Sequence, residues 1–124
     1  MNKRLLIIED DTVLQKALSS YLTAESFEVM CALDGEEGVK MAISEKPDLI
    51  LLDIVLPKKD GYQVLQEVKA NEESKHIPIV LLTNLGSIAD VEKALEMGAT
   101  TYLVKADYKL EEVTAKIKEI LNIK

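Results

Sequence analysis

Four apolar segments of this chain each end at a side chain that can bind a metal ion or a phosphoryl group. The segments are residues 5–8, 49–52, 79–82 and 102–104. The polar residues that directly follow them are, in order, Glu9 with Asp10, Asp53, Thr83 and Lys105. If the segments are neighbouring parallel strands, their carboxyl ends share one edge of a sheet, where open α/β folds bind ligands. We therefore expect the acids, the hydroxyl and the ammonium group to meet in one crevice.

The acids Glu9, Asp10 and Asp53 need a cation if they lie as close together as this arrangement implies. Two carboxylates about 4 Å apart repel by roughly 4 kcal/mol at an effective dielectric constant near 20. Oxygen ligands without clustered His or Cys favour Mg²⁺, or Mn²⁺ in its place, and such an ion would neutralise charge while a phosphoryl group moves onto a carboxylate. Thr83 adds a hydrogen-bond donor and Lys105 a mobile positive charge for phosphoryl oxygens.

The alternation of strand-like and helix-like segments predicts the fold that would position these groups. Strands are expected at residues 5–8, 27–32, 49–52, 77–82 and 102–104, each followed by apolar residues at helical spacing. Short connections imply a parallel sheet with helices on both faces, which is the doubly wound α/β class. Periodicity does not determine the strand order. The common flavodoxin-like order 2-1-3-4-5 would place the first and third strands side by side, with Asp53 facing Glu9 and Asp10.

Capping residues mark several ends of the expected helices. Asp11 or Thr12 would begin the first helix, Asp34 would begin the second, and Pro47 would close the second. Gly98 suits a left-handed residue after the fourth helix. Asp11 is therefore interpreted as a helix cap and not as a metal ligand.

Composition narrows the class of protein. The 124 residues contain no linker-like segment, so we expect one domain over residues 1–124. With 22 acidic and 15 basic residues the net charge is -7, which disfavours direct binding to nucleic acid. The apolar segment near the N-terminus is too short for a signal peptide or a membrane span, and the single Cys31, expected to be buried, suits a reducing compartment. A cytoplasmic protein without membrane contact is expected.

These residues, at these places along the chain, resemble the receiver domain of two-component response regulators. The resemblance spans residue 3 to about residue 121, and its motifs are specific in their order and spacing rather than singly. They are Glu9-Asp10, Leu51-Leu52-Asp53 with Pro57 and Gly61 behind it, Thr83, Gly98-Ala99 and Tyr102-Leu103-Val104-Lys105. The resemblance implies a phosphoacceptor switch and not an enzyme that acts on a separate substrate.

The resemblance also implies a role for each site residue. Asp53 would accept a phosphoryl group from a phosphohistidine on a sensor histidine kinase or a histidine phosphotransfer protein. Asp10 would bind the metal, with Glu9 holding it through water and the backbone carbonyl of Val55 as a further ligand.

A conformational response to phosphorylation is implied as well. Thr83 would bond a phosphoryl oxygen, Lys105 would pair with the aspartyl phosphate, and Tyr102 would turn inward when Thr83 moves. The surface of the fourth helix, fifth strand and fifth helix, about residues 87–121, would then change and control a partner protein or an output domain.

Two positions depart from the family pattern. Ala106 follows Lys105 where receivers usually have a proline in a cis peptide, and a cis bond before another residue type costs roughly 3 kcal/mol. The loop is therefore expected to be either trans and rearranged or held cis under strain. Asn84 stands where the family usually has Ala or Gly, and we expect it to alter the lifetime of the aspartyl phosphate. Neither departure removes a reacting group.

Three other functions share this fold or part of this pattern. A pseudo-receiver would be a constitutive interaction module without phosphorylation, but the presence of every reacting side chain argues against it. Phosphatases with an aspartyl nucleophile resemble a D-x-D pattern, whereas Asp53 is followed by Ile54-Val55. A flavodoxin-like cofactor binder would need a glycine-rich and hydroxyl-rich loop where this chain has acids.

The only histidine, His76, lies in a polar stretch and is expected on a surface loop without a catalytic role.

Overall fold

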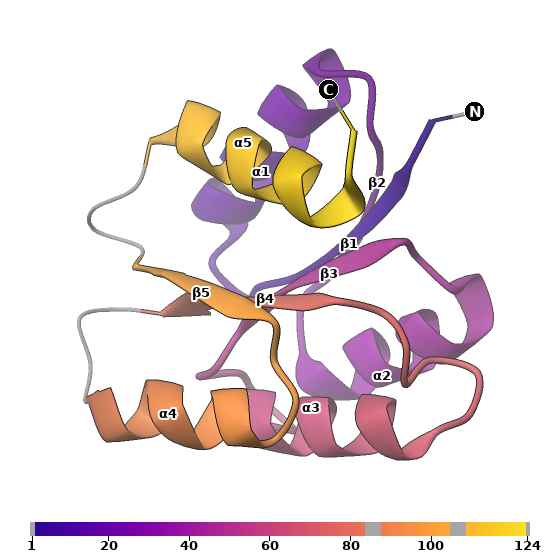
Figure 1. Ribbon diagram of the computed structural model, residues 1–124, viewed down its shortest axis with the longest axis vertical. Helices are drawn as coiled ribbons and strands as arrows, with labels where there is room; N and C mark the ends of the chain where they lie inside the picture. The colour runs from indigo at the N-terminus through magenta and orange to yellow at the C-terminus, as the bar shows by residue number, and fades with distance from the viewer. Residues whose placement is uncertain (1, 84–87, 105–108, 124) are drawn as a thin grey trace.

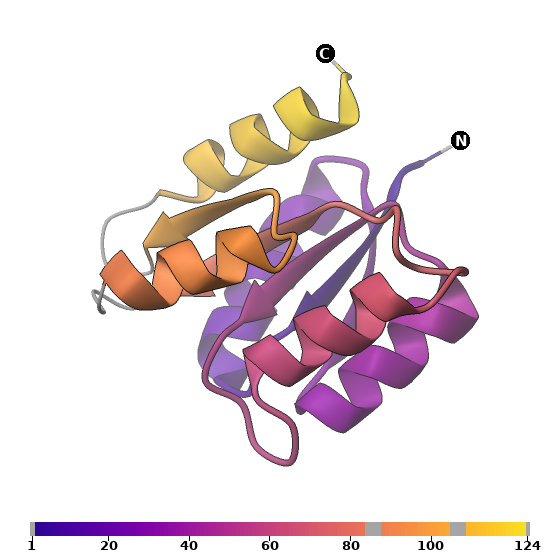
Figure 2. The same ribbon diagram turned by 60° about the horizontal axis from the view of Figure 1, so that its bottom comes forward.

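The computed structural model describes residues 2–83, 88–104 and 109–123. Within these ranges the strands are β1 (Arg4–Ile8), β2 (Glu28–Ala32), β3 (Leu49–Asp53), β4 (Ile79–Thr83) and β5 (Thr101–Val104). The helices are α1 (Thr12–Ala24), α2 (Gly35–Glu45), α3 (Gly61–Ala70), α4 (Ile88–Glu96) and α5 (Leu110–Leu121). Figures 1 and 2 show a central sheet with α1 and α5 on one face and α2, α3 and α4 on the other.

The sheet is parallel throughout, with the order β2-β1-β3-β4-β5. The predicted doubly wound α/β class and its strand order are therefore confirmed. β3 lies at the centre and all of its residues are buried, as its uninterrupted apolar run predicted. In β1, Leu6 and Ile8 join the apolar cluster beneath α2, α3 and α4, whereas Leu5 and Ile7 join the cluster beneath α1 and α5.

The register of the sheet brings the carboxyl ends of neighbouring strands to one edge. The pairs at this edge are Ile8 with Leu52, Asp53 with Leu82, and Thr83 with Val104. Because paired residues lie directly opposite each other, the residues that follow them leave the sheet close together. This edge is where the sequence predicted the reacting groups.

Helix ends agree with the predicted caps. Asp11 is the N-cap of α1, and its Oδ1 accepts hydrogen bonds from the backbone N–H groups of Val13 and Leu14 at 3.0 and 3.1 Å. Asp34 is the N-cap of α2. Gly98 follows α4 with a φ of 111°, a left-handed geometry that favours glycine.

Two strands begin later than predicted. We expected β2 from residue 27 and β4 from residue 77, but the strands begin at Glu28 and Ile79. The N–H of Phe27 donates to the carbonyl of Leu22 in the last turn of α1 at 3.1 Å, and the N–H of Ile77 donates to the carbonyl of Ser74 in the turn before β4 at 3.0 Å. These donors are therefore used locally, and the turns extend further than the apolar pattern indicated.

Predictions for Cys31 and His76, which lie away from the carboxyl edge of the sheet, can also be compared with the structure. Cys31 lies on β2 and is half-buried, not fully buried as expected, and partial burial raises the pKa of its thiol. His76 is exposed in a turn, as predicted. No helix in the described ranges combines the length and the apolar character needed to cross a membrane.

Candidate functional site

Glu9, Asp10 and Asp53 converge at the carboxyl edge of the sheet. One carboxylate oxygen of each residue lies within 4.8 Å of the corresponding oxygens of the other two. Glu9 is fully buried and Asp53 is only 5% exposed, whereas Asp10 is exposed. The structure thus brings together the two acids that follow β1 and the acid that ends β3, and two of the three are largely removed from solvent.

Backbone and side-chain hydrogen bonds fix the position of Glu9. Its N–H donates to the carbonyl of Ala32 at 3.1 Å, which extends the β1–β2 ladder by one residue. The Nε2 of Gln15 donates to the carbonyls of both Glu9 and Ala32 at 3.1 Å. The Glu9 carboxylate itself accepts from the N–H of Asp11 at 3.1 Å. The carboxylate is therefore held by the N-cap residue of α1.

Asp53 is held by the loop that follows it. Its Oδ1 accepts a hydrogen bond from the N–H of Val55 at 3.3 Å. The first residue of α3, Gly61, donates its N–H to the carbonyl of Ile54 at 2.6 Å. A Cβ on Gly61 would lie 2.5 Å from the Cα of Ile54 and 2.7 Å from the carbonyl oxygen of Asp53. Only glycine lets α3 begin this close to the acid.

The backbone of β4 places Thr83 at the same edge. Thr83 is one residue beyond Leu82, which is the register partner of Asp53. Its own partner is Val104, the last residue of β5. Lys105 and the two unusual positions, Asn84 and Ala106, lie outside the described residues, as does the peptide bond between Lys105 and Ala106.

The family described as the response regulator receiver domain matches residues 5–118. The chain belongs to this family. The predicted family is therefore confirmed, and with it the general role of its members as phosphoacceptor switches in two-component signalling.

One curated relative of this receiver is the DNA-binding dual master transcriptional regulator RpaA of Synechocystis. It is 38% identical over 118 residues, which cover 95% of this chain and 48% of RpaA. This receiver thus spans about half the length of RpaA and of other curated relatives.

Solved structures agree with the assignment. The receiver domain of the sensor histidine kinase PA1611 from Pseudomonas aeruginosa, with a magnesium ion in its active site cleft, superposes with a TM-score of 0.90 at 30% identity, covering 98% of this chain and 99% of that one. A CheY-like receiver domain protein from Methanospirillum hungatei gives a TM-score of 0.91 at 29% identity, covering 98% of this chain and 95% of that one.

The oxygen donors of this receiver fit a hard divalent cation. Among the described residues the cluster consists of carboxylates only, without His or Cys. Buried carboxylates at this separation favour a compensating cation, and Mg²⁺ and Mn²⁺ prefer such oxygen ligands. Val55, whose backbone carbonyl was predicted as a further ligand, lies two residues after Asp53 and is 76% exposed. It is therefore open to solvent and lies outside the core.

Tyr102 lies on the edge strand β5, opposite Leu81, and is 43% exposed. The side chain is thus partly open to solvent, which is the starting position that an inward turn would require. The predicted movement itself stays a prediction.

Sequence reasoning missed Gln15, whose side chain donates hydrogen bonds to the backbone carbonyls of Glu9 and Ala32. A single polar residue in the first turn of a helix carries no signal that would distinguish it from a solvated side chain. It also missed the contacts of Gly35, although an Asp-Gly pair shortly after a strand is typical of a turn in which the backbone approaches a neighbour closely.

Proposed function

We propose that this receiver is a phosphorylation switch in which Asp53 is the phosphoryl acceptor and Mg²⁺, or Mn²⁺, is the cofactor. The observation that supports it most strongly is the convergence of Glu9, Asp10 and Asp53 within 4.8 Å, with two of them buried. A capping or turn-forming role would account for a single exposed acid. It would not account for the buried pair of Glu9 and Asp53, which lie at the ends of two different strands and close together.

The chemistry follows from the placement of these groups. An oxygen of Asp53 attacks the phosphorus of a phosphohistidine, the new O–P bond forms as the P–N bond breaks, and the imidazole departs with the electron pair. The N–H of Val55 orients the Asp53 carboxylate. Glu9, Asp10, Asp53 and the Val55 carbonyl would hold the metal. When bound, the ion supplies positive charge that offsets the charge of the transferring group.

Thr83, Lys105 and Tyr102 would convert this event into a change of surface. Phosphorylation adds about -1.5 to -2 charges, which Thr83 and Lys105 would bind in a rearranged site. Moving a two-state equilibrium from 1:99 to 99:1 needs about 5.5 kcal/mol, within reach of a few charge-assisted hydrogen bonds. Tyr102 would then turn inward and alter the surface of α4, β5 and α5.

Partners follow from the same scheme. A sensor histidine kinase or a histidine phosphotransfer protein would supply the phosphoryl group. The output would lie in a downstream protein or an attached domain, since the net charge of -7 disfavours nucleic-acid binding by this chain.

Labelling with a small phosphodonor tests the proposal. The wild-type chain should take up one acid-labile phosphoryl group from acetyl phosphate in Mg²⁺ or Mn²⁺ and none in EDTA. Asp53→Asn should abolish labelling, whereas Asp11→Asn, which changes a neighbouring acid that only caps a helix, should retain it. Retained labelling in Asp53→Asn would move the acceptor elsewhere. A wild-type chain that is never labelled would be a pseudo-receiver.

Asn84 should set the lifetime of the phosphorylated state. A larger amide at this position would narrow access to the phosphoryl group or hold the attacking water. The decay of phosphorylated wild type and Asn84→Ala, followed in parallel, should therefore differ, and equal decay rates would reject this role.

A further inference from the structure

The loop between β3 and α3, residues 54–60, contains a tight turn that needs outside support. The N–H of Lys59 donates to the carbonyl of Pro57 at 2.8 Å, a three-residue turn centred on Lys58. Lys58 has a φ of 66°, a backbone geometry that is unfavourable for a residue with a Cβ. Other contacts must therefore hold this turn in place.

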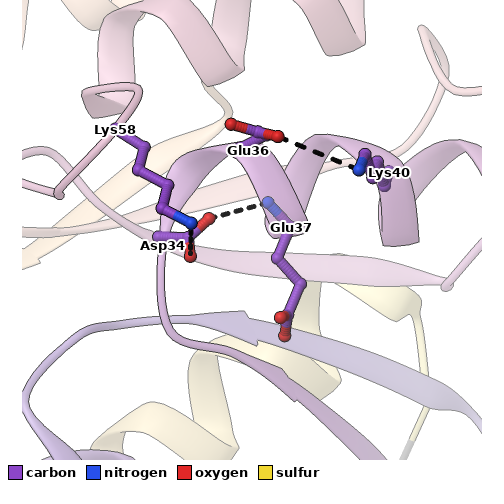
Figure 3. Close-up of a pocket in the computed structure, with 5 residues that line it drawn as sticks. All are labelled: Asp34, Glu36, Glu37, Lys40 and Lys58. Atoms are coloured by element: carbon purple, nitrogen blue, oxygen red, sulfur yellow. Dashed lines mark hydrogen bonds and ion pairs between the residues drawn. The ribbon is translucent and has the colours of Figure 1, made fainter.

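The beginning of α2 provides those contacts. The N–H of Gly35 donates to the carbonyl of Pro57 at 3.3 Å. The Nζ of Lys58 lies 3.7 Å from Oδ2 of Asp34, and Figure 3 shows the two side chains pointing toward each other. The other carboxylate oxygen of Asp34 caps α2. We name the hydrogen bond of Gly35 and the ion pair of Asp34 with Lys58 the loop clasp.

The clasp leaves no space for a side chain at position 35. A Cβ on Gly35 would collide with the carbonyl oxygen of Lys59 and lie 2.7 Å from the Cβ of Lys59. Since backbone atoms cannot rotate away, any larger residue must displace the turn. Gly35 thus sets how closely α2 approaches the loop.

Val55 depends on the ends of this loop for its position. The residue is 76% exposed, so packing contributes little to fixing it. At one end, Val55 donates to Asp53 and Gly61 donates to Ile54. At the other end the loop clasp fixes the turn. The Val55 carbonyl therefore lies between two anchored points.

We propose that Asp34 and Gly35 are positioning residues for metal binding, because the loop clasp fixes the loop that presents the Val55 carbonyl. The inference rests on the proposed function, in which that carbonyl is a ligand. Neither residue touches the metal or the phosphoryl group in this scheme. Their effect is on the affinity of the site.

The first test compares two Gly→Ala variants in the same helix. Gly35→Ala sets a Cβ against the backbone of the loop turn. At Gly38 a new Cβ would instead meet only side-chain atoms, at 2.6, 2.9 and 3.0 Å from Cδ1, Cγ2 and Cγ1 of the buried Ile8, so this variant carries a similar packing cost away from the loop. Mutations behind a metal's direct ligands typically weaken affinity about 10- to 100-fold, so Gly35→Ala should weaken Mg²⁺ binding by about 10-fold, at the lower end of that range. Gly38→Ala should change it by less than about two-fold. Calorimetric titration of metal-free protein with Mg²⁺ measures both.

The second test uses the sign of a charge effect. If only long-range electrostatics mattered, Lys58→Met would tighten Mg²⁺ binding, because it removes a positive charge, and Asp34→Asn would weaken it. A positioning role predicts that both variants weaken binding, each by about two-fold, since the pair is partly exposed. Asn preserves the cap of α2, which limits other effects of the change.

A third readout needs no metal. Exchange of the Lys59 amide hydrogen, protected by its bond to Pro57, should accelerate in metal-free Gly35→Ala and not in Gly38→Ala.

The outcomes separate the two proposals. If the wild type binds Mg²⁺ and is phosphorylated, equal affinity in Gly35→Ala and Gly38→Ala overturns the positioning role alone. If Gly35→Ala does not fold, the Lys58→Met protein decides, and tighter binding in it overturns the role. A wild type that neither binds Mg²⁺ nor accepts phosphate refutes the proposed function, and the positioning role with it.

Discussion

Replacing Asp10 by asparagine should stabilise the protein when no metal is present. The carboxylates of Asp10, Glu9 and Asp53 lie within 4.8 Å of one another, so folding brings like charges together. Asp10→Asn removes one charge while it keeps the size of the side chain. Because Asp10 is exposed, asparagine at this position leaves no buried polar group without water.

The size of this gain follows from the geometry. A pair of charges at 4.8 Å repels by about 3.5 kcal/mol at an effective dielectric constant of 20 and by about 0.9 kcal/mol in water. Because Asp10 is exposed, the repulsion of each pair is close to the value in water. The pairs of Asp10 with Glu9 and with Asp53 then contribute about 2 kcal/mol together. Loss of a favourable charge at the beginning of α1 offsets about 0.3–1 kcal/mol. The free energy of unfolding should therefore rise by about 1 kcal/mol, or about 4 °C in Tm.

Urea unfolding in EDTA at low ionic strength measures this gain. Asp11→Asn is the matched control, because Asp11 caps α1 and lies outside the cluster, and asparagine caps almost as well. Its stability should change by less than about 0.5 kcal/mol. Salt should reduce the advantage of Asp10→Asn. Mg²⁺ should reverse the order, because the wild type binds it more tightly. An Asp10→Asn protein less stable than wild type in EDTA, by an amount independent of salt, would refute the reasoning.

Two further substitutions test the surroundings of the site. Gly61→Ala forces a Cβ against the backbone of Ile54 and should lower the free energy of unfolding by about 1–3 kcal/mol, as measured in urea; an unchanged value would contradict the close approach of α3. The hydroxyl of Tyr62 donates to the backbone carbonyl of Asp90 in α4 at 3.0 Å, so Tyr62→Phe should cost about 1 kcal/mol near neutral pH. Burial, and then the nearby Asp90, raise the pKa of Tyr62 in the folded protein. The stability that the neutral Tyr62 hydroxyl provides is present below the unfolded pKa of about 10 and is lost as pH rises through the folded pKa. Tyr62→Phe should therefore lose less stability than wild type between about pH 8 and pH 11. Equal losses would argue against this coupling.

The fold was largely predictable because its strongest signals are local. The segment Leu49–Asp53 is apolar up to its final acid. Such an uninterrupted apolar run is typical of a strand that is covered on both faces. Alternation with helical segments then implied parallel strands. Strand order came from a preference among common topologies and not from the residues themselves. Once that order is given, the meeting of Asp53 with Glu9 and Asp10 follows from the register.

The supporting contacts were not predictable for a different physical reason. Gln15 and Gly35 contact segments that are distant in sequence, and their partners are backbone carbonyls that every residue type possesses. Lys58 adopts a positive φ that its residue type does not indicate. The late beginnings of β2 and β4 have a local cause, because nearby carbonyls accept hydrogen bonds from N–H groups that the apolar pattern assigned to strands.

Chemical trapping of the phosphorylated residue tests the central claim most directly. The wild-type chain is incubated with acetyl phosphate and Mg²⁺ and then reduced with borohydride, which converts an aspartyl phosphate to homoserine. Peptide mass spectrometry should find homoserine at position 53 and nowhere else, and only in samples that contained the metal. Homoserine at position 10, or at no position in a folded and metal-loaded protein, would contradict the assignment of Asp53 as the acceptor.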